Sequence, residues 1–184
     1  MSNITGGNIL LDINYVLSRA QISKDMKVAD LGCGASGHFT FPAARLVGKH
    51  GKIYAVDILK TILETINRRV KQENIKNIET IWSNLEIFKA TKIESGSLDV
   101  AMLLNTLYQS RQRAEILREA IRMLKKGGKL IIVEWKNISS PFGPSKEDQV
   151  KAELLKANAQ KLGLEIESEF DAGQYHYGII FIKI

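Results

Sequence analysis

Three glycines in one short stretch, with an acidic residue further along, form a pattern that can bind a nucleoside. The stretch DLGCGASGHFT holds Gly32, Gly34 and Gly37, follows the apolar run KVA and opens a helical segment. Glycines there let the backbone turn tightly and approach a ligand, and free N–H groups at the helix start favour an electron-rich group. Asp57 ends the next apolar run, where its carboxylate can accept hydrogen bonds from a ribose diol. The competing interpretation is a glycine turn that packs helix on strand, with Asp57 as an N-cap.

The spacing of these glycines, taken alone, indicates a dinucleotide. Gly32, Gly34 and Gly37 satisfy the G-x-G-x-x-G fingerprint of NAD-binding domains. Three features favour a different nucleoside. A helical segment precedes the first strand, the chain is too short for a dinucleotide domain plus a substrate domain, and its end predicts an antiparallel strand. An NAD-dependent oxidoreductase therefore remains an alternative.

Apolar runs alternate with segments of helical period along the chain, which is the pattern of an α/β domain. The runs hardly alternate internally, as expected of parallel strands covered on both faces. They predict strands at 27–31, 52–57, 78–82, 98–104 and 129–135. The last two runs, 164–170 and 175–184, are joined only by DAGQ, which is too short for a crossover helix. These two runs are therefore predicted to form an antiparallel hairpin.

Apolar residues at helical spacing place the helices between these strands. The predicted helices lie at 9–20, 39–47, 59–74, 116–124 and 144–163. The fourth is expected to close at Gly127 and Gly128, and the last to start at a capping box formed by Ser145 and Asp148.

The composition is that of an ordinary soluble domain, which we expect to cover residues 1–184 as one unit. The net charge of +6 is spread along the chain, so it does not indicate a nucleic-acid surface. Cys33 is the single cysteine, which excludes an intrachain disulfide framework and a cysteine-based zinc site, and we expect no metal. No signal-peptide pattern and no membrane-length apolar run is present, so we expect a cytoplasmic protein.

Four segments together give the sequence a family resemblance. The segments VADLGCGASGHFT, AVDI, LDVAMLLNTLYQ and REAIRMLKKGGKLIIVEW resemble successive motifs of the class I S-adenosylmethionine-dependent methyltransferases. Within that family the chain is similar to the ubiquinone/menaquinone-biosynthesis and arsenite groups. The resemblance implies a Rossmann-like three-layer αβα sandwich around a seven-stranded sheet of order 3-2-1-4-5-7-6, with strand seven antiparallel. The glycine loop departs from the family, because its third glycine comes one place later and Ser36 stands where a glycine is usual.

The resemblance also implies a set of residues that bind S-adenosylmethionine, with S-adenosylhomocysteine as the product. The glycine loop passes under the methionine and ribose, Asp57 holds the ribose hydroxyls, and Asn84 accepts a hydrogen bond from the adenine amino group. The alternative for Asn84 is a simple turn residue. The full expected set is Asp30, Gly32, Gly34, Ser36, Gly37, Asp57, Ile58, Asn84, Leu85 and Asn105.

Methyl transfer is an in-line displacement from a positively charged sulfur, so the protein mainly has to align the reacting atoms. A general base is needed only if the acceptor starts protonated. The candidates on the substrate side are His176, Glu134 and Tyr108, and for His176 the alternative is a histidine satisfied by packing. Residues 1–24 form an expected helical segment whose ITGGNILLD stretch is a possible lid.

The resemblance leaves the methyl acceptor open. NTLY after the fourth strand lacks the prolines of adenine-amine methyltransferases, and a lone cysteine does not fit arsenite methylation. We therefore expect a small-molecule acceptor, with no nucleic-acid partner and no membrane segment. Two alternatives stay open for the acceptor site: a shallow site, or one that a second subunit completes in a homodimer. A protein that binds the cofactor without catalysis is the alternative from another functional class.

Overall fold

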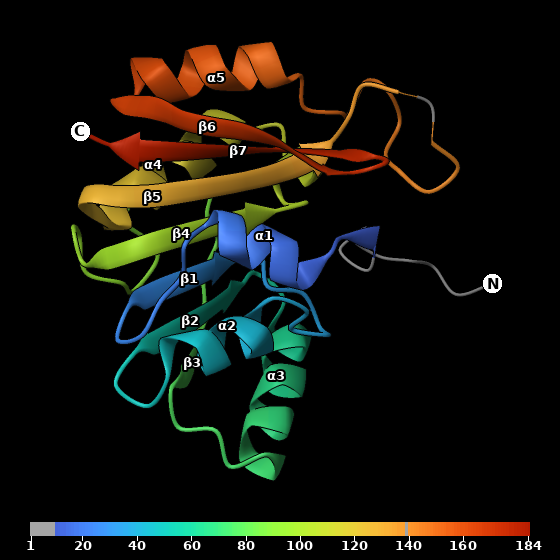
Figure 1. Cartoon of the computed structure of the whole chain (residues 1–184). Coiled ribbons are helices and arrows are strands. Elements are labelled where there is room, and N and C mark those ends of the chain that lie inside the picture. The colour runs from blue at the N-terminus through green and yellow to red at the C-terminus, as the bar shows by residue number, and fades with distance from the viewer. Residues whose placement is uncertain (1–9, 139) are drawn as a thin grey trace.

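The computed structural model describes residues 10–138 and 140–184. Their strands form one seven-stranded sheet in the order β3-β2-β1-β4-β5-β7-β6 (Figure 1). The order and the orientation of the strands confirm the predicted fold. The strands are β1 (Lys27–Leu31), β2 (Lys52–Asp57), β3 (Ile78–Trp82), β4 (Leu98–Leu104), β5 (Leu124–Trp135), β6 (Leu164–Gly173) and β7 (His176–Lys183).

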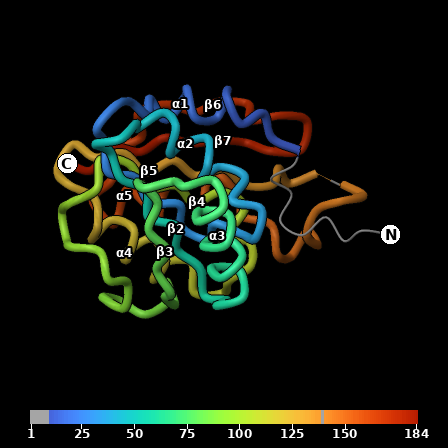
Figure 2. Tube along the Cα trace, turned by 90° about the horizontal axis from the view of Figure 1, so that it is seen from below, coloured from blue at the N-terminus to red at the C-terminus, as the bar shows by residue number. Residues whose placement is uncertain are grey.

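Helices cover both faces of the sheet and make three layers. The first face carries α1 (Ile13–Arg19), α2 (Thr40–Val47) and α3 (Lys60–Gln72), and the second carries α4 (Arg113–Met123) and α5 (Ala152–Lys161). Figure 2 shows α1 and α4 on opposite sides of the strands. The central strands β1 and β4 are therefore buried on both faces, which explains their nearly continuous apolar sequences.

The carboxyl end of the chain forms the predicted hairpin. β6 and β7 pair in antiparallel fashion around a connection of Gln174 and Tyr175, and β7 also pairs antiparallel with β5. Glu134 lies opposite Tyr177 and Trp135 lies opposite His176, so the start of β7 meets the end of β5. This edge of the sheet also carries the carboxyl ends of β1, β2 and β4.

The strand order reverses between β1 and β4, which are neighbours although two strands separate them in the sequence. In an open α/β sheet, the loops leave such a point in opposite directions and a crevice forms outside the carboxyl ends of the strands. The glycine loop after β1, Asp57 at the end of β2 and Asn105 after β4 all lie at this edge.

The prediction that a helix begins at Ser145 was wrong, because α5 begins at Ala152. Ser145 does hydrogen-bond Asp148, Oγ to Oδ2 at 2.8 Å, but in an isolated turn. The carbonyl oxygens that a helix would use are taken by distant donors: Asp148 O accepts from Arg113 at 2.6 Å and Val150 O accepts from Tyr177 at 2.7 Å.

Two other helix boundaries also differ from the prediction. Gly127 and Gly128 lie inside β5 and do not end α4, which stops at Met123. A Cβ on Gly128 would come within 2.9 Å of the Leu98 carbonyl oxygen, so this glycine permits close pairing with β4. The first helix covers Ile13–Arg19, where Asp12 caps it by accepting from the Tyr15 N–H.

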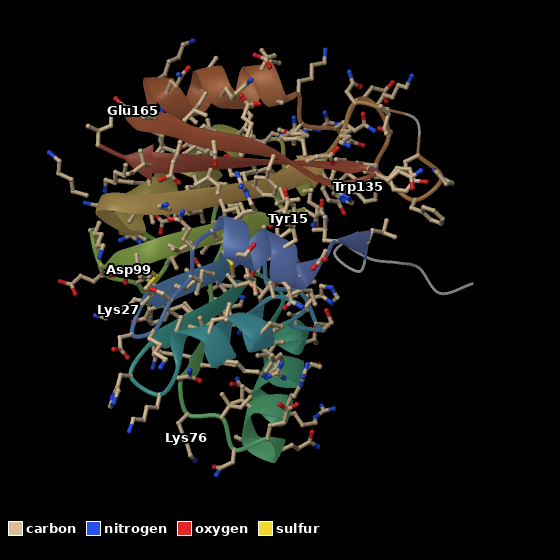
Figure 3. The ribbon with its side chains drawn as sticks, in the orientation of Figure 1. Tyr15, Lys27, Lys76, Asp99, Trp135 and Glu165 are labelled. Atoms are coloured by element: carbon tan, nitrogen blue, oxygen red, sulfur yellow. The ribbon has the colours of Figure 1, made fainter. Side chains whose placement is uncertain are left out.

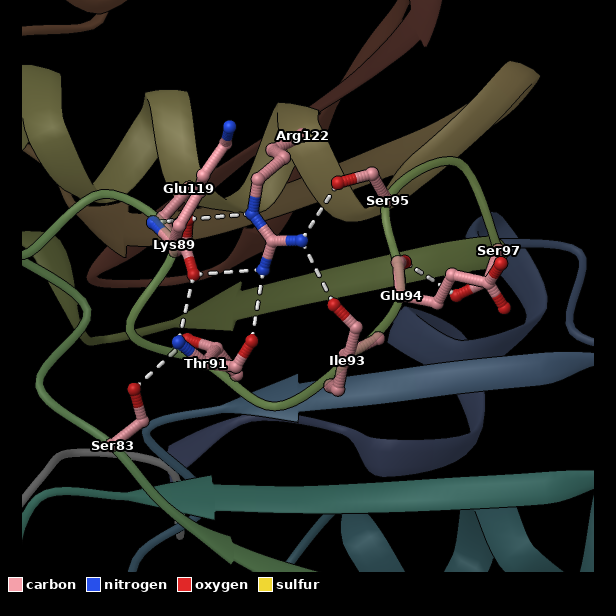
Figure 4. A network of polar contacts seen from close by, with 9 residues as sticks. All are labelled: Ser83, Lys89, Thr91, Ile93, Glu94, Ser95, Ser97, Glu119 and Arg122. Atoms are coloured by element: carbon pink, nitrogen blue, oxygen red, sulfur yellow. Dashed lines mark hydrogen bonds and ion pairs between the residues drawn. The ribbon is translucent and has the colours of Figure 1, made fainter.

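A buried ion pair fastens the β3–β4 loop to α4 (Figure 4). Both carboxylate oxygens of Glu119 accept from the Arg122 guanidinium at 2.9 Å, and they also accept the N–H groups of Lys89 and Thr91. Arg122 then donates to the carbonyl oxygens of Thr91 and Ile93. Burial raises the pKa of Glu119, but the Arg122 and backbone donors outweigh it and lower the pKa to about 2.

We expect Glu119→Gln to lower the free energy of unfolding at pH 7 by about 3 kcal/mol, because it removes one charge of a buried pair. The folded pKa lies below the ordinary value of 4.5, so this stabilisation is complete above that pH and is lost as the pH falls toward 2. Urea unfolding followed by circular dichroism across this pH range measures both effects.

The matched control is Glu115→Gln on the same helix, since Glu115 pairs with Arg118 at 2.7 Å in partly exposed surroundings. This substitution should cost about 0–1 kcal/mol. Equal stability losses in the two variants would contradict the assigned role of the buried pair.

Candidate functional site

The three glycines of the loop after β1 have different tasks. All three have positive φ, at 87° for Gly32, 65° for Gly34 and 55° for Gly37. A Cβ on Gly32 would lie 2.8 Å from Thr106 Oγ1, and one on Gly37 would lie 2.6 Å from the Phe41 ring, so both glycines permit close packing. A Cβ on Gly34 would meet nothing within 4 Å. Gly34 is therefore the glycine whose open side a ligand can approach.

Asp57 joins the glycine loop to the end of β2. Its Oδ2 accepts the N–H of Gly34 at 3.2 Å, and its Oδ1 accepts the N–H of Leu59 at 3.0 Å. The second contact closes a local turn ahead of α3, whose N-cap is Leu59 without a side-chain cap hydrogen bond, so the competing interpretation of Asp57 as an N-cap was wrong. Because each carboxylate oxygen can accept more than one hydrogen bond, these contacts leave capacity for two hydroxyl groups.

Asp30 and Ser36 connect β1 and the glycine loop to the helices α2 and α3. The buried Asp30 carboxylate accepts from Thr40 Oγ1 at 2.6 Å, which ties β1 to the start of α2. Burial raises the pKa of Asp30 to about 6, and the Thr40 hydrogen bond opposes this rise. Ser36 is exposed, and its carbonyl oxygen accepts from Arg69 of α3 at 3.3 Å.

Ile58, an expected cofactor residue, and Trp82, which was not predicted, leave apolar surface at the ends of β2 and β3. Ile58 is 51% exposed and Trp82 is 55% exposed, and the indole N–H of Trp82 donates to the Ile58 carbonyl oxygen at 2.8 Å. Asn84 forms a turn in which its Oδ1 accepts the Glu86 N–H at 2.9 Å, and Leu85 is buried beside it. The turn interpretation of Asn84 is therefore present in the structure, and its contact with an adenine stays a prediction.

The segment after β4 closes the crevice from the other side. Asn105 is buried with φ 55°, and its N–H donates to the Val133 carbonyl oxygen at 2.8 Å. Thr106 Oγ1 donates to the carbonyl oxygen of Leu31, the last residue of β1, at 2.9 Å. The sequence analysis missed Thr106 and Arg69, because each acts on the loop through a contact between segments distant in the sequence.

Glu134 and Tyr108 meet, whereas His176 points elsewhere. Glu134 Oε1 accepts the backbone N–H of Tyr108 at 3.4 Å. Neighbouring residues of a strand face opposite sides of a sheet, so Glu134 and its partner Tyr177 lie on one face and Trp135 and His176 on the other. The structure therefore divides the three candidate bases between two faces.

Two of the candidate bases, His176 and Glu134, are shielded from solvent, and Tyr108 is half-buried. The His176 ring is buried 4.2 Å from the Trp135 ring, and burial lowers its pKa to about 4, which makes it neutral at pH 7. Burial raises the pKa of Glu134 to about 8 and also raises the pKa of the half-buried Tyr108. Part of the possible lid lies in residues 1–9, outside the described residues.

A hollow of about 570 Å³ lies on the second face, between α4 and the start of α5. Arg113, Gln149, Lys151 and Leu155 contribute to its wall, and none of the expected cofactor residues does. The crevice at Gly34 and Asp57 is therefore identified by its chemistry and its place in the sheet. Among the described residues, no helix is long and apolar enough to cross a membrane.

Comparison with known proteins agrees with this arrangement. A family model described as "Methyltransferase domain" matches residues 22–174. The chain belongs to this family. The match covers every part of the crevice described above, from β1 to the start of the terminal hairpin, and it confirms the resemblance found in the sequence.

Curated relatives are similar over part of their length. The demethylmenaquinone methyltransferase of Lactococcus lactis subsp. lactis is 32% identical over 117 residues, which are 64% of this chain and 45% of that protein. A ubiquinone/menaquinone biosynthesis C-methyltransferase of Cronobacter sakazakii is 27% identical over 122 residues, covering 66% and 47%. The chain thus spans about half the length of the curated relatives it matches.

Solved structures share the whole fold. A SAM-dependent methyltransferase from Aquifex aeolicus superposes with a TM-score of 0.85 at 21% identity, covering 99% of this chain and 95% of that one. A methyltransferase from Pyrococcus furiosus superposes with a TM-score of 0.68 at 20% identity, covering 92% and 81%.

Substitution of Gly34 tests whether its open side faces a ligand. Gly34→Ala should cost about 1–2 kcal/mol of stability through its positive φ, and the added methyl group should weaken binding of S-adenosylhomocysteine at least about tenfold. The matched control is Gly127→Ala, at φ 76° with equally open surroundings in β5.

The control should lose similar stability and bind S-adenosylhomocysteine like the wild type. Thermal unfolding and isothermal titration separate the two effects. Equal affinity in both variants would show that Gly34 does not face the ligand.

Proposed function

We propose that this protein is an S-adenosylmethionine-dependent methyltransferase that acts on a small molecule. The observation that carries the proposal is the open side of Gly34 beside the Asp57 carboxylate, at the edge where the strand order reverses. Membership of the methyltransferase family and the curated relatives support it. The names of those relatives concern menaquinone and ubiquinone biosynthesis, and for this chain we propose a small-molecule acceptor without assigning its structure.

The residues of the crevice fit the parts of this cofactor. Asp57 would accept hydrogen bonds from the two ribose hydroxyls, and the exposed side chain of Ile58 offers an apolar surface for an adenine. Gly34 would let the backbone approach the ligand, and Asn105 would lie at the sulfonium end. When bound, the sulfonium supplies the methyl group, and its sulfur keeps the electron pair of the carbon–sulfur bond that breaks.

The chain contributes mainly alignment to this reaction. Positioning of two reactants can supply roughly 7–11 kcal/mol of a barrier, which agrees with a crevice whose walls are fixed by backbone hydrogen bonds. An acceptor that starts protonated needs a base, and the neutral ring of His176 has a free electron pair at pH 7. Glu134 and Tyr108 were the other sequence candidates for this step.

The burial of His176 and Glu134 favours a second candidate function, a protein that binds the cofactor without transferring its methyl group. Both functions share the cofactor crevice. They differ in whether an acceptor reaches the methyl group, so a radiolabelled methyl-transfer assay over a metabolite panel separates them.

Titration calorimetry with S-adenosylmethionine, S-adenosylhomocysteine and NAD tests the cofactor assignment. We expect the first two to bind and NAD not to bind. Asp57→Ala should weaken S-adenosylhomocysteine at least about tenfold, because a hydrogen bond to a charged group is worth about 1.5–3 kcal/mol.

Asp99→Ala is the control, since Asp99 lies at the opposite end of the sheet from Trp135 (Figure 3) and accepts the Lys27 N–H at 2.8 Å. This variant should bind S-adenosylhomocysteine like the wild type. Preferential binding of NAD, or an unchanged affinity in Asp57→Ala, would overturn the assignment.

A base role for His176 predicts that His176→Ala lowers methyl transfer by about 10²–10⁴-fold while the affinity for S-adenosylhomocysteine stays within about twofold. Steady-state turnover on an acceptor from the panel and calorimetry measure the two quantities. Turnover equal to that of the wild type would remove His176 from the mechanism.

A further inference from the structure

Glu134 is a wholly buried acid whose Oε1 accepts backbone donors on another segment. Its Oε1 accepts the N–H of Leu107 at 2.6 Å and the N–H of Tyr108 at 3.4 Å. Its Oε2 has no hydrogen-bond partner within the described chain. A buried acid is costly unless it is satisfied, and both Oε1 contacts go to one turn, so holding this turn accounts for them.

The turn that Glu134 holds has no cap of its own. Leu107 opens the short 3₁₀ helix η2 (Leu107–Gln109), and the preceding residue Thr106 makes no side-chain cap hydrogen bond to it. The first N–H groups of a helix lack partners inside the helix. Glu134 supplies that partner from β5, the neighbouring strand in the sheet.

The same turn is connected to the glycine loop. Thr106 Oγ1 donates to the Leu31 carbonyl oxygen at 2.9 Å, and the missing Cβ of Gly32 leaves room for the Thr106 side chain. A displacement of Leu107 would carry Thr106 with it and open this contact. The hydrogen bonds therefore link the end of β5 to the cofactor loop through one threonine.

The protonation of Glu134 agrees with this role. Burial raises the pKa of Glu134 to about 8, against the backbone donors Leu107 and Tyr108 and the charge of Arg113, all of which lower it. At pH 7 the side chain is then mostly a neutral acid that still offers Oε1 as an acceptor. Glutamine offers the same acceptor with nearly the same shape.

We propose that Glu134 is a positioning residue that fixes the turn at Leu107 and Tyr108, and through Thr106 the glycine loop, in the geometry that receives the cofactor. The inference rests on the proposed function, since it assigns a task within the same crevice. It replaces the earlier hypothesis that Glu134 acts as a base, because its hydrogen bonds go to the turn and its oxygens are buried.

Calorimetric titration of the wild type, Glu134→Gln and Glu134→Ala with S-adenosylhomocysteine tests the proposal. Glu134→Ala should weaken binding about tenfold or more, and Glu134→Gln should restore the affinity to within about threefold of the wild type. The control is Ile132→Ala, which removes a buried apolar side chain from the same face of β5 but no hydrogen bond to the turn. It should lower the melting temperature but leave the affinity as in the wild type.

Amide hydrogen exchange gives a readout that does not depend on the ligand. In Glu134→Ala, exchange should accelerate at least about tenfold at Leu107 and also at Gly32, whose N–H donates to Val56 O at 2.8 Å. Ile132→Ala should not raise exchange selectively at these two amides. If Glu134→Ala does not fold, Thr106→Val breaks the same linkage at its other end and should accelerate exchange at Gly32.

The outcomes separate the two proposals. A wild type that binds no S-adenosylhomocysteine overturns the proposed function, whereas the exchange rates still decide whether Glu134 controls the loop. Unchanged exchange at Gly32 in the folded Glu134→Ala or Thr106→Val variant overturns the inference. A Glu134→Gln variant that binds as weakly as Glu134→Ala also overturns it.

Discussion

The hydrogen bond between the Gly34 N–H and the Asp57 carboxylate is the contact on which the crevice depends. It joins the loop after β1 to the end of β2, on the side of β1 that faces away from β4. The loop can take this path because its glycines adopt positive φ, and the carboxylate lies there because β1 and β2 pair in parallel register. Sequence, backbone geometry and sheet order therefore agree at this one position.

Packing and ligand access are divided among neighbouring residues of the same loop. Gly32 and Gly37 accept close contacts from Thr106 and Phe41, which fixes the loop, while Gly34 stays open. A rigid loop with one open side suits a reaction that needs alignment more than acid–base chemistry. Glu134 at the end of β5 agrees with this division, since its buried carboxyl group hydrogen-bonds the turn at Leu107 and Tyr108 beside the crevice.

Much of the fold could be predicted because the strands are buried and their apolar runs are sharply bounded. β1 to β4 have the predicted limits, and the short DAGQ connection was enough to predict the hairpin. The start of α5 could not be predicted, because two residues distant in the sequence, Arg113 and Tyr177, hydrogen-bond the backbone carbonyl oxygens just before this helix. Thr106 and Arg69 were not predicted for the same reason, because their contacts with the loop join segments distant in the sequence. The strand order predicted that His176 lies at the edge of the sheet that carries the crevice, but it could not predict that its side chain is buried.

A crystal structure with S-adenosylhomocysteine bound tests the central claim most directly. The account predicts the ribose hydroxyls within hydrogen-bond distance of the Asp57 carboxylate, the ligand passing over the open side of Gly34, and the sulfur directed toward Asn105. Ligand density at another edge of the sheet, with only solvent beside Gly34 and Asp57 in a protein shown to bind the compound, would contradict it.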